Sequence, residues 1–279
     1  SDPKTLEVLD KAIERQNASA VGKVTALDLT FAKAIIQRDG ASTDANVKGK
    51  FQTDSDGLRI RWRSPDEIVT TFVIDGRTTE RGQYRSEFGA IQWLDDGKTA
   101  TNLTGDKYAR DREQLDAQLD LVGALLDVAF LARMRDDGST WTRLPAKNPD
   151  GTPTANPVLL RTPRAAAEGE LPGLTLAIEF DASTHDPVKM LVTPRVAGDP
   201  LLAIALAYND ELMTWDDAAG ASRMQIQGAG KARFPFEIHV SELTGPGGKG
   251  TPTFDLWVRR VAFNDAAKFA ADTFRKPKR

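Results

Sequence analysis

The sequence predicts an α+β protein whose structure is mainly antiparallel β-sheet. Three observations favour this fold class: many segments alternate apolar and polar residues with a period of two, turn-forming residues separate them, and helical periodicity is confined to two segments. The alternation is clearest at Leu58, Ile60 and Trp62, which are interleaved with arginines. A strand of this kind has one apolar and one charged face, so something must cover its apolar face.

The composition is that of an ordinary globular protein. The chain has 279 residues, of which 40% are hydrophobic and 28% charged, so it can bury a large core as one large domain or two small ones. Its 37 basic residues are scattered among 40 acidic ones, and the formal net charge is −3. We therefore expect no nucleic-acid partner.

The sequence contains no cysteine, which excludes disulfides, thiolate metal sites and a cysteine nucleophile. Its longest apolar stretches, at residues 121–132 and 201–208, are shorter than the ~20 residues that cross a bilayer as a helix. The chain begins with Ser1 rather than methionine, so we expect a processed protein whose signal peptide has been removed. These features fit the cytosol, the periplasm, or a lipoprotein whose anchoring cysteine has been removed.

Two segments have helical periodicity. Near the N-terminus, Asp2 and Pro3 suit the N-cap and first position of a helix that runs to about Gln16. The second segment covers residues 106–135, and its apolar residues recur at helical spacing: Leu115, Leu119, Val122, Leu126 and Phe130. Its second half is apolar nearly all round, which requires either a concave apolar enclosure or an ordinary place in a packed core. Periodicity alone favours the packed core helix.

Strands are expected on both sides of the second helix. Before it, five sequential strands are expected at about residues 21–35, 47–52, 57–63, 68–74 and 77–84, with a hairpin turn at Asp75-Gly76, which together predict an antiparallel meander. Residues 145–173 are rich in Pro and Gly and predict a long surface loop. Further strands are expected at 174–181, 188–193, 223–227, 234–243 and 254–262. Residues 202–208 also alternate, although Asp199-Pro200 could equally start a helix there.

The sequence offers little for catalysis or metal binding. Its two histidines, His185 in a turn and His239 in a strand, lack neighbours at metal-ligand spacing. Nucleophile-elbow, metalloprotease and P-loop motifs are missing. The paired acids at 95–96, 136–137 and 216–217 lie in turn-like contexts, which favours solvated turns over general acid-base roles. We therefore expect no enzyme, no catalytic residue, no metal and no cofactor.

Several short motifs occur in a characteristic order. Gly49-Lys50-Phe51 precedes a tryptophan-containing strand, which runs into Ser64-Pro65-Asp66-Glu67 and then into Val73-Ile74-Asp75-Gly76-Arg77-Thr78. Later come "GAGKARFPFEIHV" at residues 228–240 and "VAFNDAAKFAADTFRKP" at 261–277. In this order the motifs resemble those of the LolA/LolB-like periplasmic lipoprotein carriers. The resemblance covers roughly residues 1–135 and 174–277.

The resemblance implies one domain of residues 1–279, a curved, incomplete half β-barrel with helices covering its open concave side. It implies a soluble periplasmic carrier, a monomer that binds the acyl chains of lipoproteins or other lipids in an apolar cavity. The cargo would pass between envelope membranes, from an inner-membrane release machinery to an outer-membrane receptor. Ten apolar residues would line the cavity: Leu58, Ile60, Trp62, Ile68, Phe72, Ile74, Leu119, Val122, Leu126 and Phe130. The interleaved arginines Arg59, Arg61 and Arg63 would face outward, as a solvated face or as contacts for acidic headgroups or a partner protein.

The sequence also departs from these carriers. They keep an arginine-proline pair before the aromatic strand, and that arginine helps to hold the helical lid shut, whereas this chain has Thr53-Asp54-Ser55-Asp56. This chain therefore has no arginine at that place to hold a lid shut. The chain is also longer, chiefly at 145–173 and around 195–222. The alternative function is a lipid-sensing or envelope protein-binding regulatory or structural module with the same fold.

Overall fold

A computed structural model describes the structure of most of the chain. The described residues are 1–16, 24–36, 49–52, 58–74, 77–145, 147, 153–166, 173–195, 201–208, 214–215, 222–223, 225–227, 233–243, 250–264, 269–270 and 272–278. The predicted turn at Asp75-Gly76 and the Thr53–Asp56 departure lie outside them.

The helices are α1 Pro3–Gln16, the 3-10 turn η1 Asp106–Tyr108, α2 Ala109–Ala129 and α3 Leu131–Asp136. The first strands are β1 Ala26–Ile36, β2 Gly49–Gln52, β3 Leu58–Arg63, β4 Glu67–Ile74, β5 Arg77–Ser86, β6 Gly89–Asp95 and β7 Ala100–Asn102. The later strands are β8 Thr140–Arg143, β9 Val158–Thr162, β10 Thr175–Phe180, β11 Pro187–Thr193, β12 Leu201–Ala207, β13 Thr214–Trp215, β14 Ser222–Arg223, β15 Gln225–Gln227, β16 Glu237–Leu243 and β17 Gly250–Phe263.

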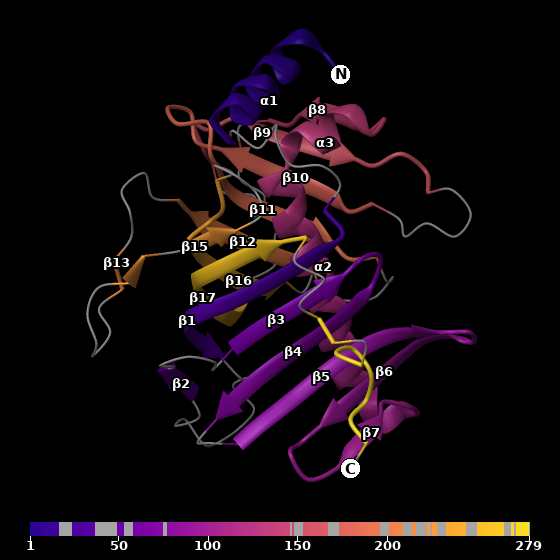
Figure 1. Ribbon diagram of the computed structural model, residues 1–279. Helices are drawn as coiled ribbons and strands as arrows, with labels where there is room; N and C mark the ends of the chain where they lie inside the picture. Colours follow the sequence, from indigo (N-terminus) through magenta and orange to yellow (C-terminus); the bar gives the residue numbers. More distant parts are fainter. Residues whose placement is uncertain are drawn as a thin grey trace.

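One large, open sheet dominates the molecule (Figure 1). Its strand order is β7-β6-β5-β4-β3-β1-β17-β16-β12-β11-β10-β9-β8, and β2 and β15 add to β1 and β17. The pairing is antiparallel throughout this path, whereas β15 pairs with β17 in parallel. The predicted class, mainly antiparallel sheet with a few helices, is thus confirmed, while closure into a half-barrel stays a prediction.

The first strands do not form the predicted five-stranded meander. Strand β1 pairs with β3 through Ala26–Thr30 and with β2 through Lys33–Ile36, so β2 and β3 share one edge of β1. The meander then continues from β3 through β4, β5 and β6 to β7. The prediction of two separate positions for β2 and β3 was wrong because alternation identifies strands but not their neighbours.

The helices lie where the sequence predicts them, with one interruption. The Asp2 carboxylate accepts a hydrogen bond from the Thr5 backbone N–H at 3.1 Å, as an N-cap should. The predicted helix at 106–135 divides at Phe130, whose backbone (φ −133°, ψ 53°) is not helical. Its ring packs edge-to-face on Phe263, with ring centroids 5.0 Å apart. The interruption therefore coincides with a tertiary contact rather than with a Pro or Gly.

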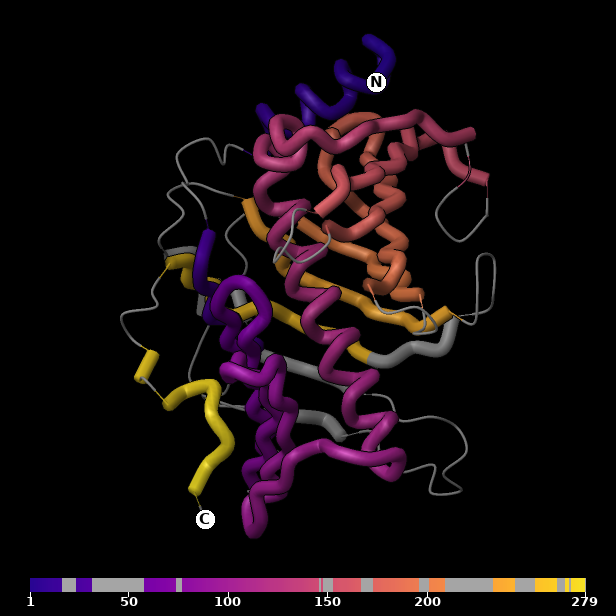
Figure 2. The backbone as a smooth tube through the Cα atoms, turned by 90° about the vertical axis from the view of Figure 1, so that its right-hand side faces the viewer, coloured from indigo at the N-terminus to yellow at the C-terminus, as the bar shows by residue number. Residues whose placement is uncertain are grey.

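Helix α2 and the C-terminal segment lie on opposite faces of the sheet (Figure 2). On the face away from α2, Trp93 packs with Val69 and Phe274, and its indole N–H donates to the Phe274 carbonyl at 2.9 Å. We call the face beneath α2 the inner face and the other the outer face. Helix α1 lies at the β8 end of the sheet, beside α3 (Figure 1).

Several other strands differ from the sequence-based expectations, and one of them decides between two alternatives. Strand β9 lies inside the predicted loop at 145–173, and its Val158, Leu159 and Arg161 are buried. The loop prediction was wrong there because the apolar run Val158-Leu159-Leu160 is only three residues long and gives a weak signal next to many turn residues. The alternation at 202–208 proves to be a strand, β12. Strands β6, β7 and β8 had not been predicted.

Candidate functional site

The candidate site is the apolar surface between α2 and the inner face. Seven of the ten predicted lining residues are buried there in one cluster: Leu58, Ile60, Ile68, Phe72, Val122, Leu126 and Phe130. Trp62 and Leu119 are partly buried and pack against the cluster, and nothing is described of the Ile74 side chain. The structure thus brings the strand and helix residues together. Burial is the same for a cavity lining and a packed core, so the lining role stays a prediction.

Register explains why these side chains meet. Leu58 lies opposite Phe72, and Trp62 lies opposite Ile68, in the antiparallel β3–β4 pair. Residues two apart on a strand share a face, so the alternate apolar residues of each strand that belong to this cluster point toward α2, whereas Val69 of β4 points to the outer face.

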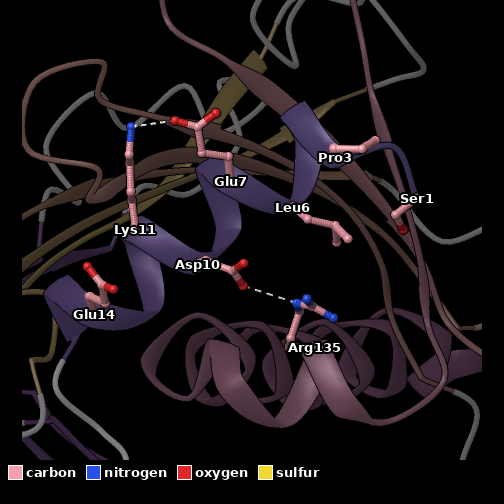
Figure 3. Close-up of a pocket in the computed structure, with 8 residues that line it drawn as sticks. All are labelled: Ser1, Pro3, Leu6, Glu7, Asp10, Lys11, Glu14 and Arg135. Atoms are coloured by element: carbon pink, nitrogen blue, oxygen red, sulfur yellow. Dashed lines mark hydrogen bonds and ion pairs between the residues drawn. The ribbon is translucent and has the colours of Figure 1, made fainter.

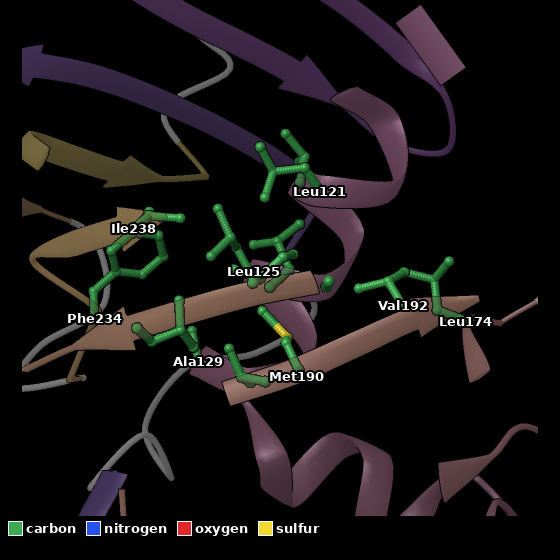
Figure 4. Close-up of a cluster of buried hydrophobic side chains, with 14 of the residues drawn as sticks. Leu121, Leu125, Ala129, Leu174, Met190, Val192, Phe234 and Ile238 are labelled. Atoms are coloured by element: carbon green, nitrogen blue, oxygen red, sulfur yellow. The ribbon is translucent and has the colours of Figure 1, made fainter. Parts of the chain in front are cut away.

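The second half of the sheet extends the same cluster. Strands β10, β11, β12 and β16 contribute buried side chains, among them Leu176, Ile178, Met190, Val192, Ile204 and Ile238. Figure 4 shows Met190, Val192 and Ile238 of this set beside α2. The sequence showed their alternation but gave no reason to place these strands beside β17 and under α2. Phe263 of β17 joins the two halves, because Phe130 contacts its ring at 5.0 Å and Phe234 at 6.0 Å between centroids.

Polar contacts fasten the first half of α2 to the sheet. Thr70 of β4 donates to the buried Gln118 side chain at 2.8 Å. Gln92 of β6 donates to Asp116 at 3.1 Å, and Arg81 of β5 contacts Asp111 at 3.3 Å. The sheet therefore supplies polar partners to the first half of α2.

Two ion pairs fasten the second half of α2. Asp120 accepts from Arg195, whose guanidinium lies 2.6 Å away, and Asp127 accepts from Arg161 at 2.9 Å. Burial raises the pKa of both carboxyl groups above the usual value, and the facing arginine opposes that shift in each case. Since the carboxylates remain paired, these groups hold the helix in place and are poor candidates for proton transfer.

The arginines interleaved in β3 face away from α2, as predicted, but they are not a solvated face. Arg59 binds the buried Asp28 carboxylate through two hydrogen bonds of 2.8 and 2.7 Å. Arg61 contacts Glu80 at 3.4 Å, and Arg63 contacts Glu67 at 2.5 Å. The predicted solvated face is therefore wrong, because acids on β1, β4 and β5 pair with the three arginines on this face of the sheet.

A groove of about 540 Å³ opens between α1 and α3 (Figure 3). Its lining is partly aliphatic, from Pro3 and Leu6, and partly charged. Asp10 contacts Arg135 at 3.1 Å across it. The groove lies beside α1 rather than under α2, so it is not the predicted hollow.

The candidate catalytic groups are engaged in local structure. The Asp96 carboxylate accepts the backbone N–H groups of Lys98 and Thr99, both at 2.8 Å, in a turn. Asp137 accepts from Arg161 at 2.7 Å. Within the described part of the chain, no three His, Asp or Glu side chains are placed to hold a metal ion. None of the described helices is long and apolar enough to span a bilayer.

Comparison with solved structures gives distant likenesses. A DUF1329 family protein from Desulfovibrio piger has a TM-score of 0.40 and 12% identity, over 99% of this chain and 98% of that chain. MucB has a TM-score of 0.23 and 11% identity, over 99% and 63%, and MucB in complex with MucA(peri) has 0.21 and 12%, over 90% and 93%. No protein-family model and no curated protein matches the sequence. Likenesses of this size identify no family.

Proposed function

We propose that the chain is a periplasmic carrier that binds the acyl chains of lipoproteins or other lipids between α2 and the inner face. One observation carries the proposal: a single apolar cluster follows α2 across both halves of an open sheet. Water exposure costs an acyl chain about 0.8 kcal/mol per CH₂, so a carrier needs apolar surface along many methylenes. A cluster that continues from β4 to β10 supplies apolar surface of that extent.

The polar contacts of α2 bear on how such a carrier would work. Ion pairs at Asp120 and Asp127 and a hydrogen bond at Gln118 secure the helix along its length. Release of the whole helix would break all of them, so cargo is expected to enter by local rearrangement of side chains beside α2. The carrier would perform no covalent chemistry.

The first experiment is mass spectrometry of lipids extracted from protein purified from its own host. We expect bound fatty acids, phospholipids or lipoprotein acyl chains in amounts approaching one ligand per protein. Extracts without any acyl lipid would contradict the proposal.

Two tryptophans allow a matched comparison. Trp62 is half-buried and packs against the inner cluster, whereas Trp257 is half-buried on the outer face, with its ring 6.1 Å from that of His239. We expect Trp62→Ala to reduce co-purified lipid several-fold and Trp257→Ala to leave it unchanged, although both remove a large side chain. Equal lipid content in the two variants would contradict the proposal, because the lipid would then bind elsewhere or not at all.

A further inference from the structure

Phe88 is the large hydrophobic side chain that the described structure leaves almost entirely in water. It is 98% exposed, at the turn between β5 and β6. Single exposed apolar residues are common on proteins and need no function by themselves. The construction of this turn, however, sets it apart from an ordinary surface position.

The turn holds Phe88 in a defined place. The Ser86 hydroxyl donates to the Gly89 carbonyl at 2.8 Å, and the Phe88 backbone N–H donates to the same hydroxyl oxygen at 3.2 Å. Gly89 has φ +112°, which L side chains rarely adopt, so glycine is needed for this turn. Phe88 is therefore presented on an ordered two-residue tip. Little conformational entropy of the backbone is then lost when the tip binds to a surface.

The tip also projects beyond the sheet. Pairing of β5 with β4 reaches only Gln83, whereas pairing of β5 with β6 continues to Ser86 and Gly89, and Figure 1 shows this hairpin extending past its neighbours. Arg85 braces the base of the projection by donating to Asp66 at 2.8 Å. Phe88 can thus reach a surface that the rest of the sheet does not touch.

We propose that this hairpin tip is a contact element for lipid surfaces and that Phe88 enters the interfacial layer of a bilayer. Aromatic side chains suit that layer: Trp and Tyr are enriched in it, and Phe is among the residues that interfacial segments bury at its boundary with the acyl chains. A specific protein interface buries about 800 Å² per partner, which a two-residue tip cannot provide, whereas a bilayer accepts a single ring. The flanking acid Glu87 is exposed, and the Arg85 charge is paired with Asp66, so zwitterionic membranes suit the tip better than anionic ones.

Vesicle flotation with the full chain tests the proposal. We expect the protein to bind phosphatidylcholine vesicles weakly, Phe88→Ser to lower the partition coefficient roughly 10-fold and Phe88→Trp to retain it. Vesicles with added phosphatidylserine should bind less at low salt, and Glu87→Gln should reduce that difference. The proposal would be overturned if the wild-type protein did not bind phosphatidylcholine vesicles, or if the Phe88→Ser variant bound them as well as the wild type.

Quenching by brominated phosphatidylcholine locates the contact. A tryptophan introduced at Phe88 should be quenched, whereas one introduced at Thr142, which is exposed on strand β8 at the sheet edge, should not. Equal quenching at both positions would also overturn the proposal. Because the inference concerns the tip alone, lipid extracted from Phe88→Ser protein should match wild type, and this keeps failure of the tip distinguishable from failure of the carrier function.

Discussion

Arg161 is predicted to be the most sensitive polar residue of the fold. Its side chain is 5% exposed and donates to Asp127 at 2.9 Å and Asp137 at 2.7 Å. It also donates to the Ser139 hydroxyl at 3.1 Å and to the Leu174 carbonyl at 2.9 Å. One guanidinium thus connects α2, the start of β8 and the start of β10 from its place on β9. Arg161→Met keeps much of the volume and removes every one of these bonds.

The expected loss of stability follows from what the substitution leaves behind. Removing one partner of a buried ion pair costs about 3–5 kcal/mol, because the other charge stays buried without compensation. Asp127 is in that position: burial already raises its pKa, and Arg161 is the strongest of the charges that oppose the shift. The Asp127 side chain keeps 28% exposure and that of Asp137 keeps 34%, so water offsets part of the cost. We therefore expect the lower end, about 3 kcal/mol.

Urea unfolding at pH 7, followed by tryptophan fluorescence, measures this loss. The double variant Arg161→Met with Asp127→Leu should recover about 1–2 kcal/mol relative to the single variant, because it removes the stranded charge. Lys11→Met is the control, since its pair with Glu7 lies on the surface, with side chains 50% and 64% exposed, and should cost less than about 1 kcal/mol. A loss below about 1 kcal/mol in Arg161→Met, or no recovery in the double variant, would refute the reasoning.

Two further predictions concern the outer face and a turn. An alanine Cβ at Gly82 would clash with the ring of the buried Trp93. Gly82→Ala should therefore lower the free energy of unfolding in urea by about 1–3 kcal/mol and increase proteolysis of the C-terminal segment, which packs on Trp93. A variant as stable as the wild type would contradict this. Hydrogen bonds from the Ser183 hydroxyl and from backbone N–H groups lower the pKa of Asp181 to about 2. The stabilisation that the ionised Asp181 carboxylate gives the fold is fully present above the ordinary pKa of 3.8 and is lost as the pH falls toward 2. Carboxyl NMR of the wild type should show a titration midpoint for Asp181 near 2, and Ser183→Ala should raise that midpoint. A wild-type midpoint near 3.8 would contradict the prediction.

The candidate site was partly predictable. Spacing identified Val122, Leu126 and Phe130 as one apolar helix face, and alternation identified Leu58 and Ile60 as one strand face, all of which the structure buries together. The polar contacts of α2 were not predictable, because nothing in the local sequence indicates that Asp127 meets a residue 34 positions later. The exposure of Phe88 was also invisible, since a turn position does not reveal how far a hairpin extends past its neighbours.

By itself, the sequence determined the type of most elements, the mainly antiparallel class and the absence of cysteine chemistry. Periodicity and capping depend on side chains within a few residues of one another, so the order of amino acids records them directly. Tertiary structure alone decided that β2 and β3 share an edge of β1, that β17 joins the two halves of the sheet, and that acids neutralise the arginines of β3. These outcomes depend on which distant surfaces fit best in the folded chain, and that competition leaves no local pattern in the sequence.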